Sequence, residues 1–372
     1  MKANNTPVTA AHYNVAIVGA GVAGLVLSVL LKRAGINHVL LLRMEARRGL
    51  ALGETLPPAA FALLDRLRLT ELVEASAKRT FGYHSMWGSS RVVDQNFFGH
   101  QPRSYGLKLN KAALLELLLE EVQPNVREFD ELTHVLVDAE GASLRIGTGT
   151  EETSIKATML VDATGRARAV LKRLGINSKA FDETVAVSCH LPRIQHPRLT
   201  HGVYVESFAE GWGIVSQLDD ERSAMTLFTN NRNPVLRSLK QYSSWHTALE
   251  NTVLLKELLS AEALTKVAGR QANSSKATQL AGNCWLAAGD AAIAFDPLSS
   301  HGITNALYGA SRAFEAIEQR IASPTGDAFA EYAKTLNSIF TEYLRQRTQR
   351  YATEQRWPST FWQQAAKHAT MA

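Results

Sequence analysis

Three closely spaced glycines stand near the start of the chain, in the run GAGVAG at residues 19–24. A short apolar run precedes them and a helical pattern follows, which is the setting in which a glycine turn binds a phosphate. Glycine permits the tight turn and lets the backbone approach a pyrophosphate, and the N–H groups of the new helix attract it. The pattern predicts a dinucleotide site at Gly19, Gly21 and Gly24, with a turn made only for packing as the alternative.

The end of the second strand predicts a weakness in this site. An acidic residue normally stands there and accepts a hydrogen bond from the adenosine ribose. Here the position holds Leu42, followed by Arg43, and the nearest acid is Glu45. Glu45 could substitute if the end of the strand bends, and is otherwise a solvated surface charge. We therefore expect the ribose to be held less firmly.

A second candidate segment is the run WLAAGDAAIAFDPLSSHGI at residues 285–303. Its apolar strand ends at Asp290, whose carboxylate can accept a hydrogen bond from a ribityl hydroxyl. Pro297 to Ile303 then leads into a helix, and the N–H groups and dipole of that helix would stabilise the negative charge of a reduced flavin. An aspartate cap followed by a turn explains either acid singly but not the whole run. The two segments together favour FAD over NAD.

The elements that must position these segments follow from the pattern of apolar residues. Residues 13–19 predict a buried strand, and residues 39–42 predict its parallel neighbour, with a helix between them. Alternation from 185 to 228 predicts a second, antiparallel sheet. From near Gly302 the chain has a helical pattern to its end. We predict an α/β fold in which a Rossmann-type FAD-binding domain is interleaved with an antiparallel-sheet substrate domain and followed by C-terminal helices.

This interpretation divides the chain into segments that cross between the domains more than once. We expect a discontinuous FAD-binding domain at 1–80, 104–183 and 270–330, a substrate domain at 81–103 and 184–269, and a C-terminal helical segment at 331–372.

Composition excludes other classes of protein. The 372 residues are 45% hydrophobic and 20% charged, which is ordinary for a globular protein. A net charge of +5 is too small and too scattered to indicate nucleic acid. Cys189 and Cys284 lie far apart, without the spacing of a metal site or a disulfide framework. The absence of a signal-peptide core and of a spanning apolar run predicts a cytoplasmic protein without a membrane partner.

The run GDAAIAFDPLSSHGI at 289–303 resembles flavin-dependent monooxygenases and tryptophan halogenases of the hydroxybenzoate-hydroxylase fold. The resemblance is closest to the flavoproteins required for cysteine tryptophylquinone biogenesis in lysine ε-oxidase and glycine oxidase. The further pieces that carry it are GETLPP at 53–58, FG at 81–82, WG at 87–88, DATGR at 162–166, EGW at 210–212, TLFT at 226–229, RWP at 356–358 and FW at 361–362.

The resemblance implies where FAD is bound. Family members carry an arginine near the helix that follows Tyr105, where this chain has Asn110-Lys111; lysine keeps the charge but lacks the planar fork. The implied cofactor-binding residues are Gly19, Gly21, Gly24, Arg43, Lys111, Asp290, Pro297, Ser300, Gly302 and Ile303.

Three residues are candidates for catalysis. His301 would meet the flavin, where it could stabilise negative charge or exchange protons near neutral pH, or simply pack on the ring edge. Glu54 would line the cavity or, with Thr55, cap the following helix. Ser300 lies on the same loop as His301. The candidates for an aromatic substrate pocket are Trp87, Tyr83, Tyr204 and Trp212, although aromatic residues in strands more often belong to the core.

The leading hypothesis is hydroxylation of a peptidyl tryptophan in a partner protein, the precursor of a quinone-cofactor oxidase. The alternatives are a hydroxylase or halogenase of a free small aromatic, and a flavin-binding chaperone or scaffold for an immature oxidase. Lys78 and Arg79 lie where halogenases place a lysine but outside any matching motif, and GWGIV at 211–215 replaces their WxWxIP signature. With no second nucleotide motif, electrons must come from NAD(P)H that docks transiently or from a separate reductase.

Overall fold

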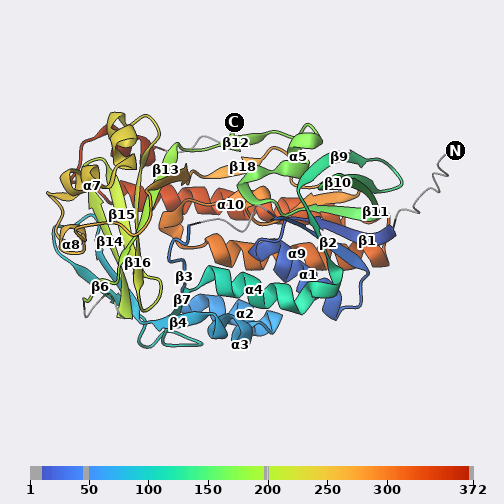
Figure 1. Ribbon diagram of the computed structural model, residues 1–372, viewed down its shortest axis with the longest axis horizontal. Helices are drawn as coiled ribbons and strands as arrows, with labels where there is room; N and C mark the ends of the chain where they lie inside the picture. The colour runs from blue at the N-terminus through green and yellow to red at the C-terminus, as the bar shows by residue number, and fades with distance from the viewer. Residues whose placement is uncertain (1–10, 45–49, 197–198, 200, 368–372) are drawn as a thin grey trace.

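The computed structural model describes residues 11–44, 50–196, 199 and 201–367. The molecule is elongated, with a large sheet near each end (Figure 1). The long helix α10 (Ala328–Ala352) runs lengthwise between the two sheets. Both large sheets therefore lie within reach of one C-terminal helix.

The first large sheet carries the glycine turn. Its strand order is β8-β2-β1-β11-β10-β9, and β19 pairs with the end of β11. β8, β2, β1, β11 and β19 form parallel pairs, whereas β10 pairs antiparallel with both β11 and β9. The strands are β1 (Ala11–Val18), β2 (His38–Arg43), β8 (Val126–Phe129), β9 (Glu131–Val137), β10 (Ala142–Thr148), β11 (Glu151–Asp162) and β19 (Trp285–Ala287). The strands predicted at 13–19 and 39–42 are thus confirmed as β1 and β2.

Helices pack on this sheet and bury it. Every residue of α1 from Val22 to Val29 is buried, because the helix lies between the sheet and two other helices, α4 and α9. The helices of this part are α1 (Val22–Arg33), α2 (Phe61–Leu67), α3 (Thr70–Ala75), α4 (Lys111–Val122), α5 (Ala169–Arg173) and α9 (Gly302–Ala322). The all-round apolar sequence of α1 is explained by this central position.

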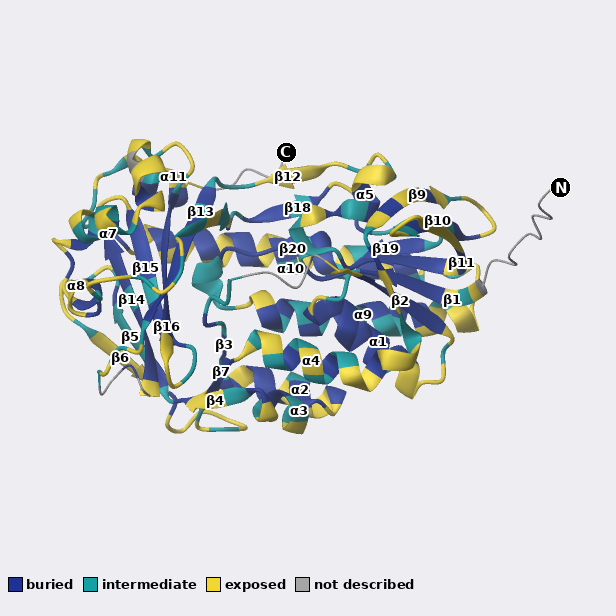
Figure 2. Cartoon of the chain, viewed as in Figure 1, coloured by how far each residue is buried: buried dark blue, intermediate teal, exposed yellow. Residues whose placement is uncertain are grey.

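The second large sheet has the order β17-β13-β16-β15-β14-β5-β6, and all neighbours are antiparallel except β14 and β5. Its strands are β5 (Gly82–Met86), β6 (Val93–Asn96), β13 (Thr184–Pro192), β14 (Gly202–Phe208), β15 (Gly211–Gln217), β16 (Arg222–Asn230) and β17 (Ala268–Gln271). Cys189 and Met225 lie on one face, in an apolar cluster with α7 (Tyr242–Leu249) and α8 (Leu254–Glu257). Trp212 and Phe228 lie on the other face. Figure 2 shows the central strands buried on both sides.

Short elements join the two large sheets. Two three-stranded sheets consist of β3 (Thr55–Leu56), β7 (Gly106–Leu109) and β4 (Ala77–Thr80), and of β12 (Ser178–Ala180), β18 (Ser275–Ala277) and β20 (Ile293–Ala294). The 3₁₀ turns are η2 (Pro58–Ala60), η3 (Gln123–Asn125), η4 (Gly165–Ala167), η5 (Pro234–Lys240), η6 (Gly289–Ala291) and η7 (Pro297–Ser299).

The C-terminal segment is helical in two parts rather than throughout. After α10 the chain continues without helix to α11 (Thr360–Ala365), where Phe361 and Trp362 are buried. These rings pack with Trp212 on the inner face of the second sheet, so the segment is a structural part of the fold. None of the described helices is both long and apolar enough to cross a membrane.

Candidate functional site

The three glycines of the turn have different structural roles. Gly19 has φ +111°, and a Cβ on it would overlap the carbonyl group of Ala163. A Cβ on Gly24 would overlap the carbonyl oxygen of Gly19. A Cβ on Gly21 would meet no described atom within 4 Å. Gly19 and Gly24 therefore permit the close packing of β1, β11 and α1, whereas Gly21 faces open space.

That open space is a cavity of about 1000 Å³. It extends from the glycine turn along α4 to the loop before β3, and Arg270 of the second sheet also lines it. The predicted residues that line it are Gly19, Gly21, Arg43, Glu54 and Lys111. Acids and bases that the sequence did not single out also line it: Glu116, Asp130, Glu131, Arg173 and Arg270.

An acid lies beside the position where the ribose-binding residue was missing. Leu42 lines the cavity and is buried, and Glu45 lies outside the described residues. Strand β8 runs parallel to β2 with Phe129 opposite Arg43, so Asp130 follows at the same edge of the sheet. Asp130 accepts hydrogen bonds from Gly149 N through its carboxylate (2.9 Å) and from Arg43 Nε through its carbonyl oxygen (3.1 Å). The carboxyl end of β8 thus offers the acceptor that β2 lacks.

Glu54 and Lys111 form an ion pair in the cavity, with Oε1 and Nζ 2.9 Å apart. The pairing of β3 with β7 places Glu54 next to the first residue of α4. Burial alone would raise the pKa of Glu54, but the charge of Lys111 and its hydrogen bond hold that pKa below its usual value. The carboxylates of Glu54 and, more weakly, Asp290 raise the pKa of Lys111. Both side chains are therefore charged at neutral pH.

Glu54 does not cap the helix that follows it, which was the alternative role expected from the sequence. No described side chain caps η2 or α2, and Thr55 Oγ1 instead lies 3.1 Å from Tyr83 Oη. The second oxygen of Glu54 is buried and has no partner among the described residues. Glu54 thus presents an acceptor to the cavity.

The loop predicted to meet the flavin, residues 296–301, leads directly into α9 and is called the flavin loop below. Asp296 caps η7 by accepting a hydrogen bond from Leu298 N (2.8 Å), and Ser300 adopts a left-handed conformation (φ 51°) that turns the chain into the helix. A Cβ on Gly302 would meet no described atom within 4 Å. The first N–H groups of α9 have no intrahelical acceptor. They can therefore stabilise negative charge.

The side chains at this helix start also fit a polar ligand. Thr304 Oγ1 is buried without a partner in the part of the chain that the structure describes. Desolvation by the surrounding protein lowers the pKa of the His301 imidazole, which favours its neutral form at pH 7. The carboxylate of Asp290 lies 3.5 Å from Arg166 Nε, and its negative charge helps to raise the pKa of Lys111. The predicted residues near this helix start thus form a group separate from the residues that line the cavity. They are Asp290, Pro297, Ser300, His301, Gly302 and Ile303.

The predicted aromatic residues separate into three places. Trp87 packs edge to face against Trp212, and Leu298 of the flavin loop packs on the same cluster. Tyr83 lies beside Thr55. Tyr204 is fully buried on the opposite face of the second sheet, with its hydroxyl 2.9 Å from His196 Nδ1, and this placement separates it from the candidate site.

The flavin loop is tied to α10 by a buried ionic network. Asp296 Oδ2 accepts from Arg347 Nε (3.2 Å) and from the hydroxyl of Tyr351 (2.9 Å), which in turn accepts from Trp212 Nε1 (3.0 Å). Desolvation would lower the pKa of Arg347, but Asp296 and Asp182 raise it. Burial raises the pKa of Asp296. The network links the loop to the aromatic cluster.

The cavity and the helix start fit an FAD molecule. The open space at Gly21 suits a pyrophosphate. One oxygen of Glu54 and the hydroxyl of Thr304 have no partner among the described residues, and a polar cofactor can satisfy both. The first N–H groups of α9 suit the pyrimidine end of a flavin.

Comparisons with known proteins agree with this fit. The family described as an FAD binding domain matches residues 12–331. The protein LodB of Marinomonas mediterranea, which carries the name of an FAD-dependent oxidoreductase, is 27% identical over 370 residues, 97% of this chain and 98% of LodB.

Two solved structures share the fold. The peptidyl tryptophan dihydroxylase QhpG, essential for tryptophylquinone cofactor biogenesis, is 23% identical with a TM-score of 0.76, covering 97% of this chain and 80% of QhpG. The myxobacterial chondrochloren halogenase CndH is 21% identical with a TM-score of 0.83, covering 97% of this chain and 87% of CndH. At these identities the likeness establishes the architecture and not the substrate.

Proposed function

Since the chain belongs to the FAD binding domain family and is an FAD-dependent oxidoreductase of the monooxygenase type, we propose that it hydroxylates a tryptophan side chain within a partner protein. The partner would be the precursor of an oxidase with a tryptophylquinone cofactor. The observation that carries the flavin part of the proposal is the cavity at Gly21, with its charged pair and the neighbouring helix start. The protein substrate is supported by the likeness to QhpG.

Different residues of this chain would have different roles at the site. Reduced FAD supplies the electrons that activate oxygen for transfer to an electron-rich ring. The backbone at Gly21 and the ammonium of Lys111 would hold the phosphate portion. The N–H groups at the start of α9 would hold the negative charge of the reduced flavin. The neutral imidazole of His301 could accept, at one ring nitrogen, the proton that the hydroxylated substrate ring releases as it regains aromaticity, and then pass that proton to solvent.

Co-expression with a quinoprotein precursor tests the proposal. With the active protein, mass spectrometry of the precursor should show added oxygen on one tryptophan. The Gly21→Val variant, which fills the phosphate space, should leave that tryptophan unmodified while the precursor still accumulates. Full modification in the presence of this variant would contradict the assignment of the cavity.

A small aromatic substrate is the second candidate, because the halogenase CndH shares the architecture. In that case, free tryptophan or a phenol should raise the rate of NAD(P)H or reductase-dependent oxygen consumption, and chloride should appear in the product if halogenation occurs. Binding of the precursor without any oxygen transfer would instead favour a chaperone.

A further inference from the structure

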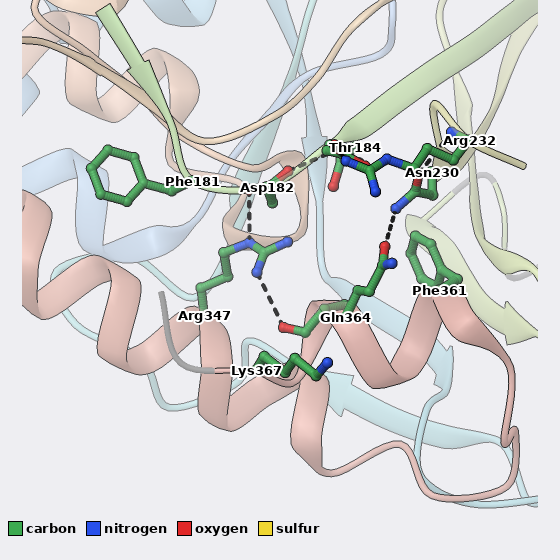
Figure 3. Close-up of a pocket in the computed structure, with 11 residues that line it drawn as sticks. Phe181, Asp182, Thr184, Asn230, Arg232, Arg347, Phe361, Gln364 and Lys367 are labelled. Carbon is green, nitrogen blue, oxygen red and sulfur yellow. Dashed lines mark hydrogen bonds and ion pairs between the residues drawn. The ribbon is translucent and has the colours of Figure 1, made fainter. Parts of the chain in front are cut away.

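A second cavity, of about 210 Å³, lies where the start of β13 meets α10 and α11 (Figure 3). Among the described residues it shares no lining residue with the cofactor cavity. Its walls combine two aromatic rings with several charged and amide groups: Phe181, Phe361, Asp182, Glu183, Arg232, Arg347, Asn230, Gln364 and Lys367. A cavity of this size suits a ligand smaller than a drug-like molecule.

The deepest charged group of this cavity is Arg347, which is 8% exposed. Its Nε contacts Asp296 (3.2 Å), and its Nη1 donates to the carbonyl oxygen of Ala365 (3.2 Å). Its Nη2 is buried and has no partner within the described part of the chain. The guanidinium lies between Asp182 and Gln364, at the wall of the cavity (Figure 3). A buried charged donor without an acceptor is unfavourable, so this nitrogen favours an incoming acceptor.

The carboxylates of the cavity are already occupied. Asp182 accepts hydrogen bonds from Thr184 N and Ser274 N, each at 2.9 Å, and lies 3.4 Å from Arg347 Nε. Glu183 accepts from Arg232 Nη2 at 2.5 Å. These acids are therefore poor ligands for an added cation.

The groups that remain are donors. Asn230 Nδ2 donates to Gln364 Oε1 at 2.6 Å, which leaves the amide nitrogen of Gln364 as a donor. Lys367 adds an ammonium group at the rim. Among the described lining residues, Arg232, Arg347 and Lys367 carry three positive charges against the two negative charges of Asp182 and Glu183, and Asp296 lies behind Arg347. The chemistry selects a ligand that only accepts hydrogen bonds and carries a negative charge.

We propose that this cavity binds a small carboxylate anion, held by Nη2 of Arg347, the amide nitrogen of Gln364 and the ammonium of Lys367. Because Nε of the same guanidinium holds Asp296, the bound anion acts on the group that anchors the flavin loop. The site does not depend on which aromatic substrate the enzyme uses.

Acetate titration of the FAD-loaded protein tests this site, with sodium chloride at equal ionic strength as the reference. We expect acetate to raise Tm in a saturable way and to change the visible absorption of the flavin over the same concentration range. Lys367→Glu should weaken acetate binding at least tenfold. Lys266→Glu makes the same charge change on an exposed lysine outside the cavity, and should bind acetate as the wild type does.

A second variant separates anion binding from a general effect of salt. Gln364→Glu places a carboxylate beside Arg347, so it should raise Tm in the absence of acetate and remove the response to acetate. An unsaturable response in the wild type, or an equal response in the wild type and Lys367→Glu, overturns the proposal. If the cavity holds only water, the response of the wild type to acetate should be unsaturable.

Discussion

Two ion clusters in this molecule have the same kind of chemistry and opposite surroundings. The side chains of Glu54 and Lys111 in the cofactor cavity are 22% and 40% exposed. In the network under the flavin loop, the side chains of Asp296 and Arg347 are 0% and 7% exposed. The first pair is partly exposed and contributes little to folding. The second pair is buried, so the loss of either partner is strongly destabilising.

The difference in exposure separates a pair that can bind a ligand from a pair that holds the flavin loop in place. A pair that is open to solvent can exchange its partner for a ligand at low cost, which suits Lys111 at a phosphate site. A pair that is closed off holds its geometry, which suits Asp296, because this residue caps η7 and fixes the approach to α9. The following predictions test this division.

The largest effect is expected from Arg347→Met. The substitution leaves Asp182 and Asp296 without their buried counter-charge, so it should reduce the free energy of unfolding by about 3–5 kcal/mol, measured by urea denaturation. Arg345→Met on the same helix removes an exposed pair with Glu342 and should leave the free energy of unfolding nearly unchanged. Equal losses of unfolding free energy in the two variants would show that the buried pair is no more important for stability than the exposed pair.

Gly21→Val should act on the cofactor and not on the fold. Its backbone is extended (φ −80°), and an added side chain would enter the cavity. We expect FAD affinity to fall at least a hundredfold, about 2.7 kcal/mol, by fluorescence titration, with nearly unchanged stability of the apoprotein. Gly19→Val, by contrast, should prevent folding because of its clash with Ala163. A folded Gly21→Val protein with wild-type affinity would disprove the phosphate site.

Asp130→Ala tests the acceptor at the end of β8. We expect FAD affinity in the micromolar range for the wild type, because Leu42 replaces the usual acid, and about tenfold weaker binding in the variant. Asp138→Ala is the matched control, since its carboxylate also accepts backbone hydrogen bonds at a turn but lies outside the cavity. Nanomolar binding that survives Asp130→Ala would show that another group holds the ribose.

The smallest of these expected effects is that of Glu54→Gln, which should lower the free energy of unfolding by less than about 1 kcal/mol at neutral pH. The pKa of Glu54 is held below its ordinary value of 4.5, so its contribution is present above that pH and is lost as the pH falls through the lower, folded-state pKa. Urea midpoints measured across this range should converge for the variant and the wild type at acidic pH. A gap that widens on acidification would mean that the pair does not stabilise the charged form.

The sequence predicted the parts of the site that depend on neighbours in the chain. Strand β1, the glycine turn and α1 form one local unit, as do η7, Ser300 and the start of α9. Asp130 could also have been found, because parallel neighbours end at the same edge and β8 lies next to β2. That inference requires only the strand order.

Other features depend on pairing that the pattern does not specify. Tyr204 and Trp212 lie on adjacent strands and both looked suitable for a pocket, yet they face opposite sides of the sheet. A shift of one residue in register exchanges the two faces, so composition cannot decide between them. The contact of Glu54 with Lys111 likewise depends on β3 pairing with β7.

The network under the flavin loop has a consequence for synthesis of the protein. Tyr343, Arg347 and Tyr351 all contact Asp296, and they follow it in the chain. While a ribosome still holds α10, the loop is without its anchors, even though the glycine turn was made long before. Anchoring of the flavin loop is therefore a late event that must follow the translation of α10, and a nascent chain stalled before residue 343 would carry this loop without those contacts.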